Sequence, residues 1–162
     1  MIKLYVVLGS TRPNRKSEIV APLVLAAMKK LDDVEVELID LRDWPLPFYQ
    51  EPTSVEKDMK YSIPLAHTWS DKIKLGDGFL IVTPEYNHGY TAVLKNALDY
   101  LETEWFRKPV AFVSYGGSTG GSLAVEQLRL VSIELKMVPV STAVHLVRFK
   151  QELDEHGIPT NP

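Results

Sequence analysis

Short apolar runs alternate with longer amphipathic stretches along most of this chain. The apolar runs have the length and near-continuous character of buried parallel strands, and the stretches between them repeat apolar residues at helical spacing. Strands are expected at residues 4–8, 34–39, 78–83, 110–115 and 137–140. Helices are expected at residues 17–31, 64–75, 91–101 and 122–135. After Ser141 the pattern fades.

This alternation of strand and helix predicts an α/β protein with a parallel sheet and helices on both faces. Five strands without a long insertion fit the doubly wound, flavodoxin-like order 2-1-3-4-5. The 162 residues are expected to form a single domain, residues 1–162. Ligands of such sheets bind beyond the carboxyl ends of the strands, near strands one and three.

Residues 148–162 form a polar tail that contains Gly and Pro and is too short for the helix that normally ends this fold. Without that helix, one face of the sheet is partly uncovered. We expect a subunit contact to cover it.

Composition narrows the classes of function. A net charge of −3, without a long basic run, argues against nucleic acid as the main partner. The absence of cysteine removes disulfides, thiolate catalysis and cysteine-based metal sites, and the four histidines lack metal-ligand spacing. No apolar run approaches the about 18 residues that a membrane span needs. The chain starts directly on a strand without a signal-peptide pattern, so we expect a cytoplasmic protein without a membrane or metal site.

The loop after the first strand is rich in groups that bind anions. Three cations and several hydroxyl groups lie between the strand and the start of the next helix, and they include Ser10, Arg12, Arg15, Lys16 and Ser17. Unpaired N–H groups and the positive end of the dipole attract phosphate to a helix N-terminus. The loop is therefore interpreted as a phosphate site, with a solvated basic turn as the alternative.

Two more loops are expected at the same edge of the sheet. The first has the sequence PEYNHGY and contains Pro84, Glu85, Tyr86 and Asn87. The second, YGGSTGG, contains Tyr115, Gly116, Gly117 and Ser118, and its glycines allow another surface to approach closely. Together the three loops suit a ligand with a phosphate at one end and a flat hydrogen-bonding ring at the other. FMN has that shape.

Plainer interpretations exist for the same residues. Glu85 is equally well read as a helix cap, and Asn-His-Gly is itself turn chemistry, which would explain Asn87. Tyr86 and Tyr115 also suit half-buried aromatic positions. Among rival folds, the chain lacks the GxGxxG of dinucleotide-binding domains, the GxxxxGK[ST] of P-loop NTPases and the cysteine of low-molecular-weight phosphatases.

The chain resembles the NADPH-dependent FMN reductases, which include quinone, azo-dye and chromate reductases. The resemblance runs from residue 2 to about residue 145, in the family's order and spacing. It rests on LGSTRPNRKS, TPEYNHGYTAVLKNALDYL and SYGGSTGG, and also on DLRDWPLPFYQE after the second strand. The PEYN segment followed by LKNALD is its most specific part.

The resemblance implies an NAD(P)H-dependent oxidoreductase in which bound FMN carries the chemistry and no side chain serves as a dedicated catalytic group. It implies that Ser10, Arg12, Arg15, Lys16 and Ser17 hold the FMN phosphate, with the choice between the two arginines left open. It places the flavin ring along Pro84, Glu85, Tyr86 and Asn87, and closes its other side with Tyr115, Gly116, Gly117 and Ser118. It further implies a homodimer or homotetramer, in which residues 44–49 help to wall a neighbour's site.

Two alternatives to a reductase remain at this point, an electron carrier like flavodoxin and a regulatory flavin-binding protein. Flavodoxins are usually more acidic and lack paired arginines in the phosphate loop, which favours the reductase. The choice between NADPH and NADH, and the small-molecule acceptor (quinone, azo compound or free flavin), stay open.

Overall fold

The computed structural model describes residues 1–52, 61–148, 154 and 160, and its centre is a parallel sheet. The strands are β1 (Ile2–Leu8), β2 (Val34–Asp40), β3 (Gly78–Pro84), β4 (Pro109–Gly116), β5 (Val138–Pro139) and β6 (Val144–Val147). Their order is β2-β1-β3-β4-β5, and β6 also pairs with β4. The predicted flavodoxin-like topology is confirmed.

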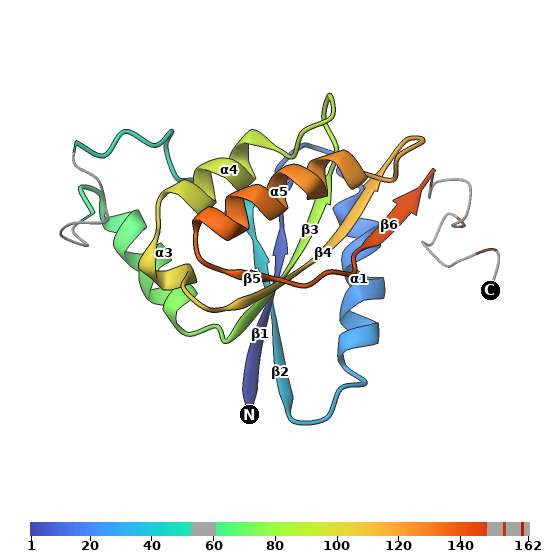
Figure 1. Ribbon diagram of the computed structural model, residues 1–162, viewed down its shortest axis with the longest axis horizontal. Helices are drawn as coiled ribbons and strands as arrows, with labels where there is room; N and C mark the ends of the chain where they lie inside the picture. The colour runs from blue at the N-terminus through green and yellow to red at the C-terminus, as the bar shows by residue number, and fades with distance from the viewer. Residues whose placement is uncertain (53–60, 149–153, 155–159, 161–162) are drawn as a thin grey trace.

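Helices cover both faces of the sheet, as expected. Figure 1 shows α3, α4 and α5 on one side and α1 on the other. The helices are α1 (Ser17–Met28), α3 (Pro64–Lys74), α4 (Ala92–Asp99) and α5 (Ser122–Glu134), with 3-10 turns η1 (Leu41–Asp43) and η2 (Thr103–Trp105). Pro64 occupies the first turn of α3, where its missing N–H costs nothing, and Thr91 caps α4 by accepting a hydrogen bond from the Leu94 amide at 3.2 Å.

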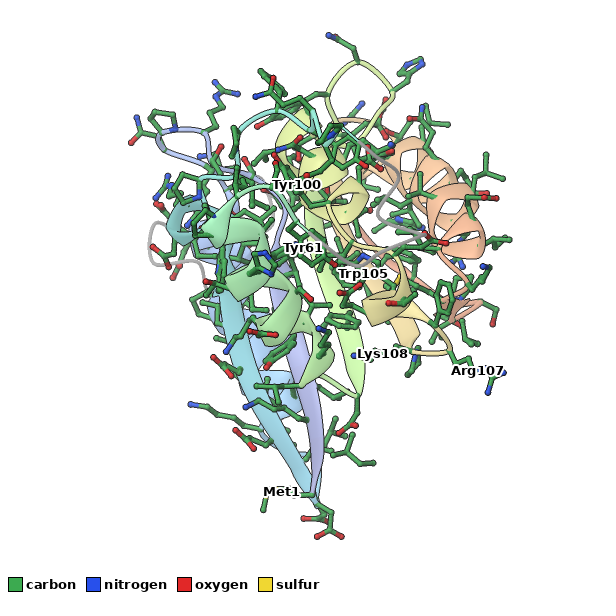
Figure 2. All side chains as sticks on the ribbon, turned by 90° about the vertical axis from the view of Figure 1, so that its left-hand side faces the viewer. Met1, Tyr61, Tyr100, Trp105, Arg107 and Lys108 are labelled. Atoms are coloured by element: carbon green, nitrogen blue, oxygen red, sulfur yellow. The ribbon has the colours of Figure 1, made fainter. Side chains whose placement is uncertain are left out.

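Alternating side chains of each strand enter two separate cores. Tyr5 and Val7 pack beneath α3 and α4, whereas Val6 and Leu8 pack against Val20 of α1. This period of two is what a sheet buried on both faces requires. The core under α3 and α4 is the larger and includes Tyr61, Tyr100 and Trp105, which Figure 2 shows in the interior of the molecule.

One ionised group lies inside the larger core. Tyr61 Oη and Ser70 Oγ each donate to Glu104 Oε1 at 2.5 Å. Burial would raise the pKa of Glu104, but these hydrogen bonds outweigh it and hold the pKa below its ordinary value. The cluster ties α3 to η2 and lies away from the predicted loops.

The fifth strand differs from the expectation. The expected strand at 137–140 is only Val138–Pro139, and a further strand that was not predicted, β6, pairs with β4 from Val113 to Gly116. Between the two strands, the Arg129 guanidinium donates to the carbonyls of Val140 at 2.6 Å and Ser141 at 2.8 Å.

An apolar groove of about 380 Å³ lies beside α1 on its face of the sheet. Its walls include Val24, Met28, Leu80, Val113 and Leu146. In the described residues α1 is the helix on this face, which agrees with the expected partial exposure. Except for Arg148, Asp154 and Thr160, the predicted polar tail lies outside the described residues.

Among the described residues, no group of three or more His, Asp or Glu side chains is placed to hold a metal ion. The helices of the described part are too short or too polar to cross a membrane.

Candidate functional site

The three loops predicted to converge do meet at the carboxyl edge of the sheet, at the upper end of the strands in Figure 1. The hydroxyls of Ser10 and Tyr86 lie 3.2 Å apart and join the loops after β1 and β3. The Glu85 carboxylate joins the loop after β3 to the loop after β4, by accepting from Thr119 Oγ1 at 3.1 Å. Side-chain contacts therefore hold the three loops as one unit.

Arg15 is the buried cation of the first loop. Its guanidinium forms a two-pronged ion pair with Asp40 at the end of β2, and Nη1 also donates to the Ser10 carbonyl at 2.6 Å. This pairing holds the pKa of Asp40 below its ordinary value. Arg15 is thus already neutralised, and it shapes the loop in which Ser10 lies.

Arg12 is the exposed cation of the same loop. Its carbonyl accepts from Arg42 Nη2 at 2.8 Å, which fixes the backbone, and its guanidinium forms no ion pair with the residues that the structure describes. The N-terminus of α1, immediately after Lys16, has no side-chain cap in the described chain. Charge and helix amides therefore combine here into an anion-binding surface.

A cavity of about 270 Å³ opens between this surface and the other two loops. Its walls include six of the predicted site residues from the first two loops, and Tyr115 from the third. The lining consists of Ser10, Arg12, Asn14, Arg15, Lys16, Pro84, Tyr86 and Tyr115. A pocket of hydroxyl and cationic donors beside aromatic rings has the donor set that a phosphate monoester requires.

Ser17 is fully buried and is not part of the lining of this cavity. Tyr115 is next to it. Burial raises the pKa of Tyr115, and the neighbouring Ser17 hydroxyl and amide partly oppose that rise. The phenol therefore stays protonated at neutral pH.

The second loop is a tight hairpin. Tyr86 and Gly89 exchange backbone hydrogen bonds of 2.8 and 3.0 Å, and the residues between them, Asn87 and His88, have φ of 50° and 68°. Two positive φ values are the mark of a type I′ turn, in which Asn is favoured. The turn alternative therefore accounts for Asn87, which is exposed at the tip and lines neither cavity described here.

Glu85 caps a helix. Its second oxygen accepts from the Leu123 amide at 3.1 Å, in the first turn of α5. A carboxylate at this position satisfies an unpaired amide and faces the positive end of the helix dipole. The position of the Glu85 carboxylate therefore agrees with the alternative interpretation of this residue as a helix cap.

The third loop depends on different glycines from those predicted to face the ligand. Gly120 and Gly121 have φ of 60° and 86°, and a Cβ on Gly121 would lie 2.8 Å from Ser114 Cβ. Gly116 and Gly117 accept hydrogen bonds from the Arg148 amide, each at 3.2 Å. Together with exposed Ser118 they lie outside the linings of both cavities.

A larger cavity of about 560 Å³ adjoins the first and shares Ser10, Arg12 and Tyr86 with it. Apolar side chains from two segments form most of its remaining wall. These are Leu46, Pro47 and Phe48 after η1, and Ala92 and Val93 at the start of α4. One cavity with cationic donors and one with apolar walls therefore adjoin at Tyr86.

The sequence analysis did not single out Thr91 and Asn96, which line the larger cavity. Thr91 Oγ1 also donates to the Gly9 carbonyl and so fastens α4 to the first loop. The sequence held a signal for Asn96, because it is a polar residue among the apolar residues of α4. The structure leaves it only 9% exposed on the inward face of that helix. Residues 44–49, expected to wall a neighbour's site, contribute Leu46, Pro47 and Phe48 to the cavity of their own chain.

These features define a flavodoxin-like α/β protein with a cationic loop and an adjoining apolar cavity at the switch point of its sheet. Residues 2–151 match the family model described as NADPH-dependent FMN reductase. The chain belongs to this family of FMN-dependent NAD(P)H oxidoreductases.

Curated relatives agree with this assignment. An NAD(P)H-dependent FMN reductase of Schizosaccharomyces pombe is 40% identical over 151 residues, which cover 91% of this chain and 75% of the relative. The Saccharomyces cerevisiae NAD(P)H-dependent FMN reductase LOT6 is 34% identical, with 84% of this chain and 76% of the relative covered.

Solved structures confirm the fold. FerB from Paracoccus denitrificans, titled a flavoenzyme NAD(P)H:(acceptor) oxidoreductase, superposes with a TM-score of 0.76 at 23% identity, and covers 99% of this chain and 87% of its own. Flavodoxin 1 from Bacillus cereus gives a TM-score of 0.57 at 16% identity, over 90% and 84% of the two chains.

Proposed function

We propose that the chain binds FMN across the two adjoining cavities and transfers electrons from NADPH or NADH to a small aromatic acceptor. The observation that carries this proposal is that two neighbouring cavities share Ser10, Arg12 and Tyr86, one with cationic donors and the other with apolar walls. A ligand with a phosphate at one end and a flat ring at the other needs both surfaces, side by side.

Ser10, Arg12, Lys16 and the amide of Ser17 would hold the phosphate. Arg12 is the better placed arginine, because Arg15 already pairs with Asp40. Arg15 instead fixes the Ser10 carbonyl and thereby the shape of the loop.

The flavin ring would lie beside Tyr86, between Pro84 and the Tyr115–Gly117 turn. Glu85 and Asn87 act indirectly in this proposal, through the cap on α5 and through the hairpin, and exposed Ser118 lies at the edge. When bound, FMN supplies the hydride acceptance and the electron transfer. The protein contributes binding, orientation and a wall of apolar side chains that keeps water from one side of the ring.

The acceptor would enter the larger cavity, whose lining of Leu46, Pro47, Phe48 and Val93 suits a flat apolar molecule. Quinones, azo compounds and free flavin all have that form. Relatives named NAD(P)H:quinone oxidoreductase, from Solanum tuberosum, and NADPH azoreductase, from a Bacillus, support these classes.

Steady-state NADPH oxidation with added FMN tests the proposal, with 1,4-naphthoquinone, methyl red and free FMN offered as acceptors in turn. We expect turnover with at least the quinone, and the same reaction with NADH substituted gives the nicotinamide preference. Absence of turnover with all three acceptors and both nicotinamides would overturn the proposed reductase activity.

We further propose that the protein is a homodimer or homotetramer, and that it works in the cytoplasm. The apolar groove beside α1 supports the oligomer, because exposed apolar surface of this kind favours association. Both statements remain predictions from the sequence.

A further inference from the structure

The segment that forms the outer wall of the larger cavity has no helix or strand of its own. Between η1 and residue 50 the chain is held at its ends by aromatic contacts, with the Trp44 ring 4.9 Å from that of Trp69 and the Tyr49 ring edge-on to Tyr100 at 5.3 Å. Leu46, Pro47 and Phe48 lie between these two anchors and line the cavity. Something other than secondary structure must fix them.

A single side chain of α4 supplies the missing hydrogen bonds. Asn96 Nδ2 donates to the carbonyls of Leu46 at 3.2 Å and Pro47 at 2.8 Å, and its Oδ1 accepts from the Tyr49 amide at 2.8 Å. These bonds fall on both sides of Phe48. The amide group therefore fixes the backbone immediately before and after that residue.

Phe48 is 81% exposed, although it lines the cavity. Its ring is not buried in a core that would hold it, so the direction it takes is set by the backbone that Asn96 clamps. Asn96 in turn is placed by α4, which is fastened to the first loop through the Thr91–Gly9 hydrogen bond. Phe48 is thus linked, through Asn96 and Thr91, to the same loop that forms the proposed phosphate site.

We propose that Asn96 is a positioning residue that holds Phe48 at the mouth of the larger cavity, and that Phe48 selects flat aromatic acceptors by stacking against them. The inference rests on the proposed function, since it concerns the acceptor step of that same site. It assigns a role to the LKNALD segment, which the sequence comparison marked as specific but left without a function.

Two acceptors of different shape separate this role from a general loss of folding. Naphthoquinone is a flat aromatic molecule that can stack on Phe48, whereas ferricyanide is a small anion that takes electrons without a stacking surface. Phe48→Ala is expected to raise the KM for naphthoquinone about tenfold, the scale of one aromatic contact, and to affect ferricyanide reduction much less than naphthoquinone reduction. Phe48→Tyr should restore the wild-type KM, because it keeps the ring.

Asn96→Asp keeps the shape of the side chain but removes both donated hydrogen bonds. It should raise the naphthoquinone KM as Phe48→Ala does. The KM of the double variant should be no higher than that of the single variant with the higher KM, because both changes remove the same stacking contact. Lys95→Ala is the matched control on α4, since Lys95 pairs with Asp99 at the surface, and it should change neither KM. Effects that multiply in the double variant, or an unchanged KM in Asn96→Asp, would overturn the proposal.

Chymotrypsin cleavage of the flavin-free protein reports the clamp independently of activity. Trp44 and Leu46 precede prolines and resist cleavage, so Phe48 and Tyr49 are the sites in this segment. Faster cleavage after Phe48 in Asn96→Asp than in wild type supports the clamp even if the wild type proves inactive, in which case the proposed function alone has failed. Equal cleavage rates would overturn the clamp itself.

Discussion

At the scale of single residues, the structure separates two arginines that look alike in the sequence. Arg12 is exposed without an ion pair among the described residues, and Arg15 is buried against Asp40. We predict that Arg12→Ala weakens FMN binding about 10- to 100-fold, as loss of a charged hydrogen bond implies, without lowering thermal stability. Riboflavin, which lacks the phosphate, should bind the variant and the wild type equally. Fluorescence titration with both flavins measures this, and equal losses for the two would contradict the role of Arg12.

The Arg15–Asp40 pair has a predictable pH dependence. The pKa of Asp40 is lowered in the folded protein by Arg15, so the stabilisation is present above the ordinary Asp pKa, near 4, and is lost as pH falls through the folded value. Asp40→Asn should cost about 3 kcal/mol at pH 7, because it removes the main partner of the buried Arg15 charge and leaves only the half-exposed Glu18 carboxylate, 3.4 Å from Nε. Urea unfolding at several pH values should show this difference narrowing below about pH 4. A difference that does not change with pH would contradict the ion-pair account.

The sequence alone could show that the first loop is cationic but not which cation is available. Asp40 lies 25 positions beyond Arg15, on a neighbouring strand, and only the parallel register of β1 and β2 brings it to the loop. For the same reason Asn96 could be placed on a helix, whereas its three hydrogen bonds to residues 46–49 depend on tertiary structure. Asn87 is the opposite case, because its turn role follows from local sequence.

At the scale of elements, the glycines of the loop between β4 and α5 differ in whether the structure has room for a side chain. Gly121→Ala should destabilise the protein by at least about 1 kcal/mol, since Gly121 has a positive φ and a Cβ would meet Ser114. Gly117→Ala is the matched control in the same loop, because nothing lies within 4 Å of its added Cβ. Urea unfolding of both variants checks the contrast, and equal stabilities would show that the loop tolerates a side chain at Gly121.

The long periodic elements were predictable, whereas the edge of the sheet was not. The strands up to β4 and the four α-helices of the described residues occur where the apolar pattern indicated, within a few residues, since each buries a continuous stripe. The β6 segment was missed because it is short and because three of its four residues are exposed, so that it carries little apolar signal. Its pairing with β4 is dictated by that neighbour rather than by its own sequence.

At the scale of the whole molecule, the groove beside α1 bears on the oligomeric state. Apolar side chains of α1, β3, β4 and β6 meet there. We predict that the protein is a dimer or tetramer in solution, which light scattering coupled to size exclusion measures directly. A stable monomer at micromolar concentration would contradict this prediction and leave the groove as an ordinary surface feature.

The central claim is that this molecule as a whole couples a nicotinamide to a bound flavin, and an anaerobic visible spectrum of the FMN-loaded protein tests it most directly. On addition of one equivalent of NADPH, rapid bleaching of the bound flavin is the predicted result. Flavin that binds but keeps its oxidised spectrum, with NADH as well as NADPH, would contradict the reductase account and favour an electron carrier or a regulatory flavoprotein. Failure to bind FMN at all would contradict the assignment of the two cavities.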